Sequence, residues 1–268
     1  MAINKNSTGY TFTFAILMVV IVGTVLAFTA MSLKDRQAAN AADKKMMDIL
    51  GAIGVDANRS NASELFAEYV TERIAIDLSG KEVDRRSGAL DMKDKSDPFS
   101  IDVQRDYRGS VKAAAKANKD DIAGLKSALS GANLTFPLFR CNSPEGKDVY
   151  VVPVVGSGLW GPIWGYVALE SDMQTVYGAK FDHKTETPGL GAEIKETMFT
   201  EKWPGKRMNA SGPVLFEVVK GGAPTSDYQV DGITGGTITS KGVGEMVNRT
   251  MAIYASYFKS QTQASAQR

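Results

Sequence analysis

One segment near the C-terminus combines small residues and hydroxyl groups in a way that suits a bound phosphate. Residues 230–244 read VDGITGGTITSKGVG. Glycine lets a backbone approach an anionic group closely, and the unpaired N–H groups at the start of a helix attract phosphate. The segment therefore predicts a phosphate site, although an ordinary glycine-rich turn has a similar composition. The glycines are Gly232, Gly235, Gly236, Gly242 and Gly244, and the hydroxyls belong to Thr234, Thr237, Thr239 and Ser240.

This segment differs from the common phosphate-binding motifs. Lys241 follows Ser240, whereas a Walker loop places its lysine before the serine or threonine. The glycine spacing is also not the G-x-G-x-x-G that follows a strand in dinucleotide-binding domains. The chemistry expected here is that of a hydroxyl and a phosphate, without a nucleotide-binding fingerprint.

Other reactive side chains are scarce, because the chain has one histidine, His183, and one cysteine, Cys141. These two cannot make a structural zinc site, which needs about four such ligands, and one thiol cannot make a disulfide framework or C-x-x-C. A Ser-His-Asp triad would depend on His183 alone, and no G-x-S-x-G elbow is present. We expect no metal site and no catalytic side chains, so that any chemistry belongs to a cofactor.

The composition is that of a globular protein without a strong charge. Of the 268 residues, 43% are apolar and 23% charged, and 31 basic residues face 30 acidic ones for a net charge of +1. A near-neutral chain has no bulk field to hold nucleic acid. We therefore expect no nucleic-acid partner.

The N-terminal part predicts a single transmembrane helix. No charge lies between Lys5 and Lys34, and the apolar run from Phe12 is long enough, at about 1.5 Å per residue, to cross roughly 30 Å of hydrocarbon. A cleaved signal peptide and a buried core helix fit less well. The predicted organisation is a tail at 1–11, a transmembrane helix at 12–32, a helical stalk and helix-rich accessory region at 33–140, a sheet-containing domain at 141–260 and a flexible tail at 261–268.

The accessory region is expected to be mainly helical and polar. The stalk would end near Gly54, and a second helix is expected over residues 62–77, where apolar residues recur at helical spacing. Residues 79–98 have the composition of a surface excursion or linker. The Ala- and Lys-rich residues 111–131 predict a solvated helix.

The C-terminal half predicts a sheet closed by a helix. Short β-rich runs lie at 149–155, 163–170, 175–181 and 214–220, separated by turn residues. A final helix is expected over residues 240–258. Two further glycine-rich loops are unusual, GSGLWGPIWG at 156–165 and ETPGLGAE at 186–193. The expected fold class is α+β, with the transmembrane helix followed by a sheet-containing domain and packed helices.

The sequence DGITGGTITS at 231–240 resembles the flavinylation motif of the covalent-FMN domain family, with Thr237 at the position of the FMN acceptor. With the transmembrane helix, the stalk, the G-L-W and E-T-P-G-L-G loops and the V-K-G-G-A-P run at 219–224, the chain is similar to the NqrC family of the Na⁺-translocating NADH:quinone oxidoreductase (Nqr). Position 236 is glycine, where that family more often has alanine. The RnfG family of the Rnf complex shares the flavin domain and remains an alternative.

The resemblance implies an electron carrier with FMN bound covalently through its phosphate to Thr237. A flavin transferase using FAD and Mg²⁺ would attach it, and Thr234 and Thr239 are rival acceptors. From the positions of Thr239 and Ser240 we expect helix capping or phosphate hydrogen bonding. The phosphate or the ring would also contact Lys220, Gly221, Gly232, Gly235 and Gly236, whereas Leu159, Trp160, Glu186, Thr187 and Leu190 would line the isoalloxazine.

The resemblance also implies partners and a location. The chain would be the electron-carrying member of a six-subunit sodium pump in the bacterial inner membrane, without its own NADH or quinone site, and its large domain would be periplasmic. The basic residues that follow the membrane helix, such as Lys34 and Arg36, suggest the opposite orientation. A membrane-tethered module that binds a free phosphate ligand, without redox function, is a further alternative.

Overall fold

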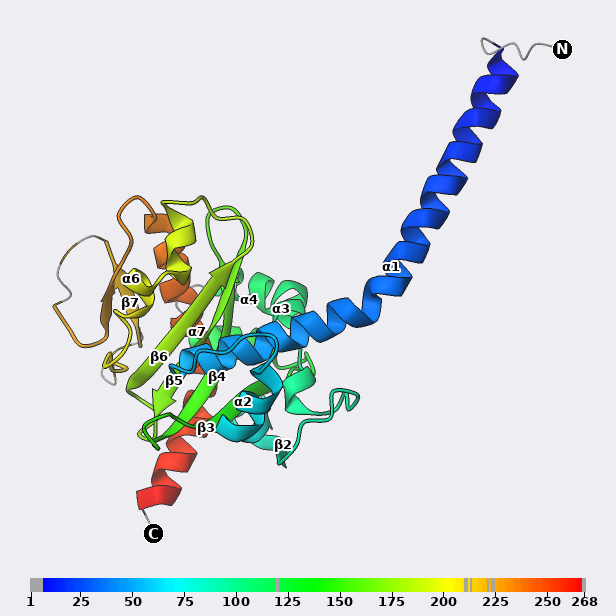
Figure 1. The fold of residues 1–268 in the computed structure, drawn as a ribbon. Helices are drawn as coiled ribbons and strands as arrows, with labels where there is room; N and C mark the ends of the chain where they lie inside the picture. Colours follow the sequence, from blue (N-terminus) through cyan, green and yellow to red (C-terminus); the bar gives the residue numbers. More distant parts are fainter. Residues whose placement is uncertain are drawn as a thin grey trace. The chain divides into compact units, whose positions relative to one another are not determined.

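The computed structural model describes residues 7–118, 121–209, 212, 214–220, 222 and 225–266 (Figure 1). The chain divides into two units, residues 1–45 and residues 46–268. The expected boundary at residue 140 falls inside the second unit and stays a prediction, as do the other predicted domain limits.

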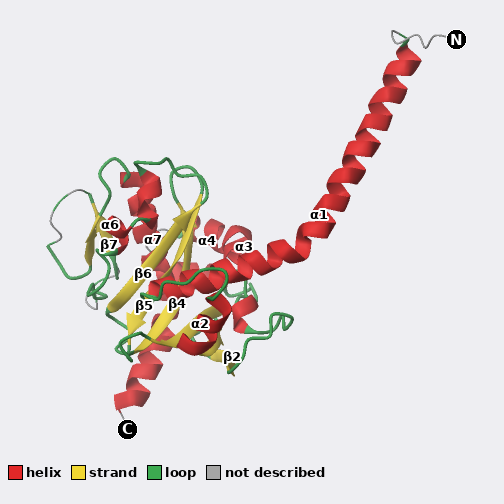
Figure 2. Cartoon of the chain, viewed as in Figure 1, coloured by secondary structure: helices red, strands yellow, loops and turns green. Residues whose placement is uncertain are grey.

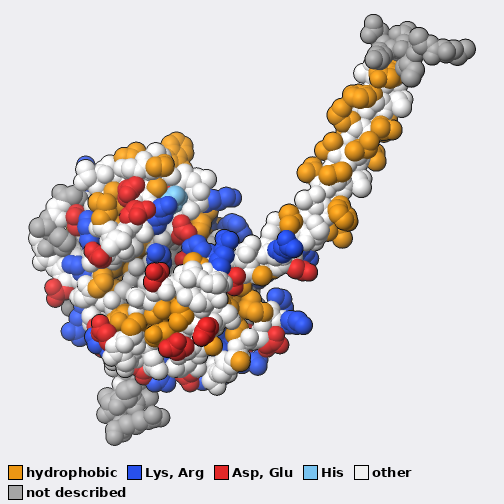
Figure 3. Space-filling view, in the orientation of Figure 1, with side chains coloured by type: hydrophobic (Ala, Val, Ile, Leu, Met, Phe, Trp, Pro, Cys, Tyr) orange, Lys and Arg blue, Asp and Glu red, His pale blue; other side chains and the backbone are white. Residues whose placement is uncertain are grey.

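The first unit consists of the N-terminal part of helix α1 (Thr8–Ala52). This helix has a window of mean hydropathy 2.6, and none of that window is buried, so the helix is long and apolar enough to cross a membrane. Apolar side chains cover the visible face of its first half (Figure 3). The helix runs through the predicted stalk and ends just before Gly54, whose φ of +79° is typical of a glycine that follows a helix.

The second unit is built on an antiparallel sheet of six strands in the order β2-β1-β3-β4-β5-β6 (Figure 2). Strands that follow one another are therefore neighbours from β3 to β6, because short turns join antiparallel strands. The strands are β1 (Val70–Ile76), β2 (Glu82–Ser87), β3 (Phe136–Asn142), β4 (Asp148–Ser157), β5 (Pro162–Glu170) and β6 (Val176–His183).

Both faces of the sheet are covered, so its central strands are buried almost continuously. Helix α7 (Thr237–Ala266) packs on one face, where Val247 and Met251 belong to the same buried core as Val152 and Val154 of β4. On the other face, Phe66 of α2 (Ala62–Tyr69) packs edge-on against Phe139 of β3. The last turn of α1 lies against β6, where a Cβ at Gly178 would stand 2.3 Å from the carbonyl oxygen of Ala52. Only glycine permits that approach.

A smaller layer lies beside the main sheet. Strands β7 (Glu217–Val219) and β8 (Gln229–Asp231) pair in parallel. Phe199 and Trp203 pack against Phe181 and Phe216, which joins this layer to the main core. Helical segments η3 (Gly191–Lys195) and α6 (Thr197–Thr200) precede it.

The structure confirms the strands expected at 149–155, 163–170 and 175–181, whereas only Glu217–Val219 forms a strand within the range expected at 214–220. The final helix is also confirmed, but it starts three residues earlier than expected and continues to Ala266. The helix expected over residues 62–77 is wrong in its second half. Residues 70–76 form β1, the strand that pairs with both β2 and β3. The run V-T-E-R-I-A-I also suits a strand, and pairing on two sides decides in its favour.

Part of the polar excursion is also a strand, because residues 82–87 form β2 at the edge of the sheet. Its charged side chains are typical of an edge strand that must not pair with another molecule. The accessory helices are η1 (Pro98–Ser100), α3 (Val103–Asp106), the π-helical turn η2 (Tyr107–Val111), α4 (Lys112–Ala117) and α5 (Ile122–Leu129). The solvated helix expected over 111–131 is thus two short helices, with Val111, Leu125 and Leu129 buried.

Cys141 is fully buried in β3. Burial raises the pKa of its thiol well above the ordinary range. The thiolate, which is the reactive form, is therefore disfavoured, and Cys141 acts as a small core residue.

Candidate functional site

The glycine- and threonine-rich segment ends at the N-terminus of α7. Thr237 is the first residue of this 30-residue helix, and the amide of Ser240 donates to the Gly236 oxygen at 2.9 Å. The N–H groups of the first helical turn have no acceptor within the helix. They and the helix dipole favour a negative group at this end, as a phosphate site requires.

The four hydroxyls of the segment differ in their availability. Thr239 is 2% exposed, and its Oγ1 donates to Oε2 of Glu186 at 2.6 Å. Ser240 is also buried, and its Oγ accepts from the Ile233 amide at 3.0 Å. Thr237 is half-buried and Thr234 exposed. The Thr239 and Ser240 hydroxyls therefore bond to groups outside the first turn of α7, and the phosphate hydrogen bonding expected for these two residues stays a prediction.

Glu186 connects three loops from inside the protein. This residue is 5% exposed, and its Oε1 accepts from the Trp160 amide at 2.8 Å while Oε2 accepts from Thr239. The 158–161 loop, the 186–193 loop and the start of α7 therefore meet at one carboxylate. A contact with flavin was expected for Glu186, whereas here both of its oxygens already have protein partners.

Glycines make this meeting possible. A Cβ at Gly158 would stand 2.5 Å from Glu186 Oε1, and a Cβ at Gly191 would stand 2.4 Å from Oε2. A Cβ at Gly236 would stand 2.9 Å from the Leu190 oxygen, so this backbone leaves little room for the alanine that the flavinylation motif usually carries. At Gly235 the φ of +80° also favours glycine.

Large apolar side chains are exposed on the loops that meet at Glu186. The exposed fractions are 50% for Leu159, 66% for Trp160 and 43% for Leu190. Ile238, beside Thr237 on α7, is 60% exposed and was not anticipated from the sequence. Exposed apolar side chains near a polar site are typical of a surface that a ligand or partner covers.

The remaining predicted residues lie around this site. Thr187 is exposed, and its carbonyl oxygen accepts from the amides of Leu190 and Ala192, both at 3.1 Å, so it shapes the loop. Lys220 is exposed directly after β7. Gly232 is buried where its amide donates to the Val219 oxygen at 2.9 Å. Gly221 lies outside the described residues.

Two charged side chains at the start of the motif form a pair that the sequence did not reveal. Lys202 Nζ lies 3.0 Å from Asp231 Oδ2, and both are partly exposed. Asp231 begins the motif and ends β8. A pair between residues far apart in sequence leaves no local signal, so only the fold could show it.

His183 supports the same loops. Its Nδ1 accepts from the Glu186 amide at 3.2 Å. Its buried Nε2 has no partner among the described residues.

Within the described part of the chain, no group of three or more His, Cys, Asp or Glu side chains is placed to hold a metal ion. The arrangement instead combines a helix N-terminus, a free threonine hydroxyl and exposed apolar side chains. Such residues can hold a phosphate at one end of a ligand and an apolar ring at the other. FMN has both parts, so the residues fit this cofactor.

The match to known families defines the class of protein. Residues 158–252 match the FMN-binding domain family, and this range includes the three loops that meet at Glu186. The chain is thus an FMN-binding-domain protein, and its described residues include a helix long and apolar enough to cross a membrane.

Relatives over the whole chain identify the particular family. NqrC, a component of the Na(+)-translocating NADH-quinone reductase, is 31% identical in Vibrio parahaemolyticus over 91% of this chain and 90% of its own. Two crystal structures of NqrC share the fold. The structure from Parabacteroides distasonis is 34% identical, with a TM-score of 0.65 over 84% of this chain and 96% of that one. The structure from Shewanella oneidensis is 25% identical, with a TM-score of 0.59 over 84% of this chain and 99% of that one. The chain belongs to the NqrC family, whose members are components of the Na(+)-translocating NADH-quinone reductase, an oxidoreductase complex.

Proposed function

We propose that the chain carries FMN joined through its phosphate to the hydroxyl of Thr237. The observation that carries this proposal is the different state of the motif's hydroxyls. Thr239 and Ser240 are buried and hydrogen-bonded, whereas Thr237 is half-buried at the N-terminus of α7. Thr234 is exposed but precedes the helix, so its hydroxyl gains less from the helix dipole.

The attachment reaction requires an accessible hydroxyl and a separate enzyme. A flavin transferase with Mg²⁺ would use FAD as the donor. The Thr237 oxygen forms a bond to the flavin-side phosphorus, the phosphoanhydride bond breaks, AMP leaves, and the hydroxyl proton goes to a base. The product is a phosphodiester whose charge lies beside the N–H groups of the first turn.

The protein residues then position the flavin. FMN supplies the redox chemistry when bound, and the protein sets its position and surroundings. Leu159, Trp160, Leu190 and Ile238 offer apolar surface, and Lys220 offers positive charge near the phosphate or ring. Glu186 contributes indirectly because it holds the loops in place.

We further propose that the chain passes electrons one at a time within an Nqr complex that couples NADH oxidation by quinone to Na⁺ movement. The names of the relatives support this role. Covalent attachment suits a relay because a tethered carrier keeps a high effective concentration. NADH and quinone would bind to other subunits.

The proposed location is the bacterial inner membrane, with α1 as the anchor and the large domain in the periplasm. The candidate membrane helix and the family support the anchor. An alkaline phosphatase fused after Arg268 is expected to be active, since that enzyme folds only outside the cytoplasm. An inactive but expressed fusion would place the domain inside.

The proposal is tested by mass after co-expression with the transferase. The unsubstituted chain is expected to gain the mass of FMN less one water and to fluoresce in a denaturing gel. Thr237→Ala should lose both signals, Thr237→Ser should retain part, and Thr234→Ala is the matched control that should retain both. An unmodified wild-type chain would refute the flavin proposal, and a modified Thr237→Ala would move the linkage to another residue.

A further inference from the structure

A second surface lies beside the loop that carries Leu159 and Trp160. There the π-helical turn η2 and the start of α4 face the 157–162 loop across an open cavity of about 310 Å³. The wall on the helix side carries Arg108 and Lys112, and none of the described residues that line the cavity has a carboxylate. We name this the cation–tryptophan surface; its lining is Gln104, Tyr107, Arg108, Lys112, Val155, Ser157, Gly158, Leu159, Trp160, Gly161 and Pro162.

The two cations are exposed and not neutralised. Neither Arg108 nor Lys112 forms an ion pair with any residue in the described ranges, although Arg105 on the same helical stretch pairs with Asp106. Two exposed positive charges beside a cavity attract an anionic partner.

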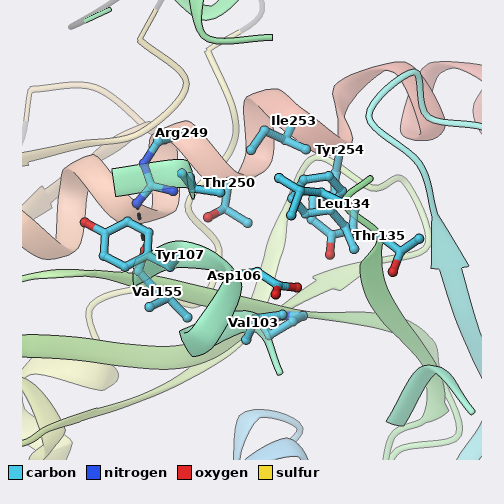
Figure 4. A pocket seen from close by; sticks show the side chains of 13 residues that line it. Val103, Asp106, Tyr107, Leu134, Thr135, Val155, Arg249, Thr250, Ile253 and Tyr254 are labelled. Atoms are coloured by element: carbon cyan, nitrogen blue, oxygen red, sulfur yellow. Dashed lines mark hydrogen bonds between the residues drawn. The ribbon is translucent and has the colours of Figure 1, made fainter. Parts of the chain in front are cut away.

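The helix that carries them is held firmly on its buried side. The Arg249 guanidinium lies 5.0 Å from the centre of the Tyr107 ring and donates to the Val155 oxygen at 2.7 Å (Figure 4). The Tyr107 hydroxyl lies 3.3 Å from Ser157 Oγ, at the base of the opposite loop. The two walls are thus tied together, and the cations are positioned on an anchored element.

The turn itself is unusual. The amide of Lys112 donates to the oxygen of Tyr107, five residues earlier, which is the π-helical pattern. Single π turns within helices occur frequently at functional sites. This one presents Arg108 and Lys112 toward the cavity while Tyr107 and Val111 stay buried.

The opposite wall has the composition of a protein interface. Trp160 is the aromatic side chain of this loop and is 66% exposed, and Trp and Arg are enriched at the centres of interfaces. The Glu186 hydrogen bond holds the Trp160 backbone, so the ring is presented from a fixed loop. A protruding side chain of a protein fits a concave wall better than a flat lipid surface does.

We propose that the cation–tryptophan surface is the docking site for a redox partner protein of the complex, which inserts a protruding acidic loop into the cavity beside Arg108 and Lys112 and covers Trp160. This inference rests on the proposed function, because the same 158–161 loop would hold the flavin. Docking here brings the partner next to the cofactor, as electron transfer between subunits requires. It also assigns a role to the accessory segment around residues 103–117.

The test uses the complete complex with the double substitution Arg108→Glu and Lys112→Glu. The variant should fold and carry FMN, since both residues are exposed. Reduction of its flavin after NADH is added should be slowed about tenfold or more, because like charges at a docking site are strongly unfavourable. The variant chain should also dissociate from the complex at a lower salt concentration than the wild-type chain does. The double glutamine variant, which removes attraction without adding repulsion, should show a smaller loss.

Lys116→Glu is the matched control, because this exposed lysine lies one turn further along the helix and does not line the cavity. It should retain the wild-type rate. If the glutamate variant carries FMN and matches Lys116→Glu at every salt concentration, the docking proposal is wrong while the flavin proposal stands. A wild-type chain without FMN would instead refute the proposed function.

Binding to vesicles containing phosphatidylglycerol separates a lipid surface from a protein partner. The wild-type and double glutamate chains should bind these vesicles equally, through α1. A loss of vesicle binding in the variant, with an unchanged rate of flavin reduction, would overturn the proposal in favour of lipid.

Discussion

Glu186 shows how one buried side chain organises a site through its hydrogen bonds to other parts of the protein. Its two oxygens accept from an amide of one loop and a hydroxyl of the final helix, in a space that two glycines keep open. Buried carboxylates are costly unless hydrogen-bonded. The hydrogen bonds offset that cost here and fix three segments relative to one another.

Replacement of Glu186 by alanine should therefore weaken both stability and flavin attachment. The Trp160 amide and the Thr239 hydroxyl would lose their acceptor, at about 1–3 kcal/mol for the buried hydroxyl and less for the partly buried amide. Glu186→Gln should behave better, because its oxygen can still accept from Trp160 and its amide can donate to Thr239. Urea unfolding and the FMN content after co-expression measure the two effects.

The exposed Glu196, ten residues further along the chain, supplies the control. Its carboxylate lies near the exposed Lys195, so Glu196→Ala leaves no buried group unpaired. An alanine variant at 186 that matches this control in both measurements would show that the loops do not depend on the carboxylate.

At the scale of elements, charged pairs hold the edge of the sheet. Arg73 points from β1 into the protein, where it meets Asp97 at 3.0 Å with both side chains almost fully buried. The guanidinium also donates to the Gly88 oxygen at 2.8 Å, and Asp97 accepts from the Phe99 amide at 2.8 Å. This one pair attaches the segment that follows β2 to the sheet.

Asp97→Ala should reduce the free energy of unfolding by about 3–5 kcal/mol, because a buried guanidinium is left without its counter-charge. Asp97→Asn should reduce the free energy of unfolding by less, since the asparagine side chain keeps one oxygen that can accept a hydrogen bond. Asp94→Ala is the control on the same loop, where the carboxylate is partly exposed, accepts from the Ser96 amide and hydroxyl, and lies 3.9 Å from Arg86. Denaturant unfolding compares them, and equal stability of the two alanine variants would show that the buried pair contributes nothing.

A second group joins β2 to α7. Glu82 accepts from Arg85, and the Tyr257 hydroxyl donates to it at 3.1 Å. The hydrogen bond from Arg85 holds the pKa of Glu82 below its ordinary value of 4.5. The folded state therefore binds this proton less readily than the unfolded chain does.

The stabilising contribution of Glu82 is present above its ordinary pKa and lost as the pH falls through the lower folded-state value. The thermal midpoint should thus fall more steeply below about pH 4.5 in the wild type than in Glu82→Gln. Melting curves from pH 7 downward test this. Parallel curves for the two proteins would mean that the ion pair has no net effect.

On the scale of the whole molecule, the chain consists of an apolar helical unit and a compact unit that begins inside the same helix. The compact unit starts at Met46, and Met46, Ile49 and Leu50 of α1 are almost completely buried in it. A single continuous helix is therefore exposed in its first part and buried in the compact unit at its end. Its first part has exposed apolar side chains all along, and its last turns belong to the core.

A fragment of residues 46–268 should consequently be soluble without detergent and unfold cooperatively. A fragment that begins at Gly54 should be markedly less stable, because each large apolar side chain removed from the core contributes about 1.5–3 kcal/mol. Solubility and urea midpoints of the two fragments check this. Equal midpoints would place the last turn of α1 outside the folding unit.

Several features could be predicted from local sequence. The apolar run that forms α1, the strands from β4 to β6 and the final helix follow from hydropathy and periodicity over neighbouring residues. The motif around Thr237 also indicates a phosphate-type site, because glycines and hydroxyls at short spacing lie within a single turn. These properties depend on residues close together in the chain.

Tertiary structure alone decided the rest, because it depends on contacts between distant segments. Val70–Ile76 becomes a strand because β2 and β3 pair with it, although its spacing also fits a helix. Thr239 is unavailable because Glu186, far away in sequence, accepts its hydroxyl. Likewise, Arg108 and the Trp160 loop line one cavity only because the fold brings these distant segments together. Local patterns determined which chemistry the chain can offer, and long-range packing determined which groups remain free for it.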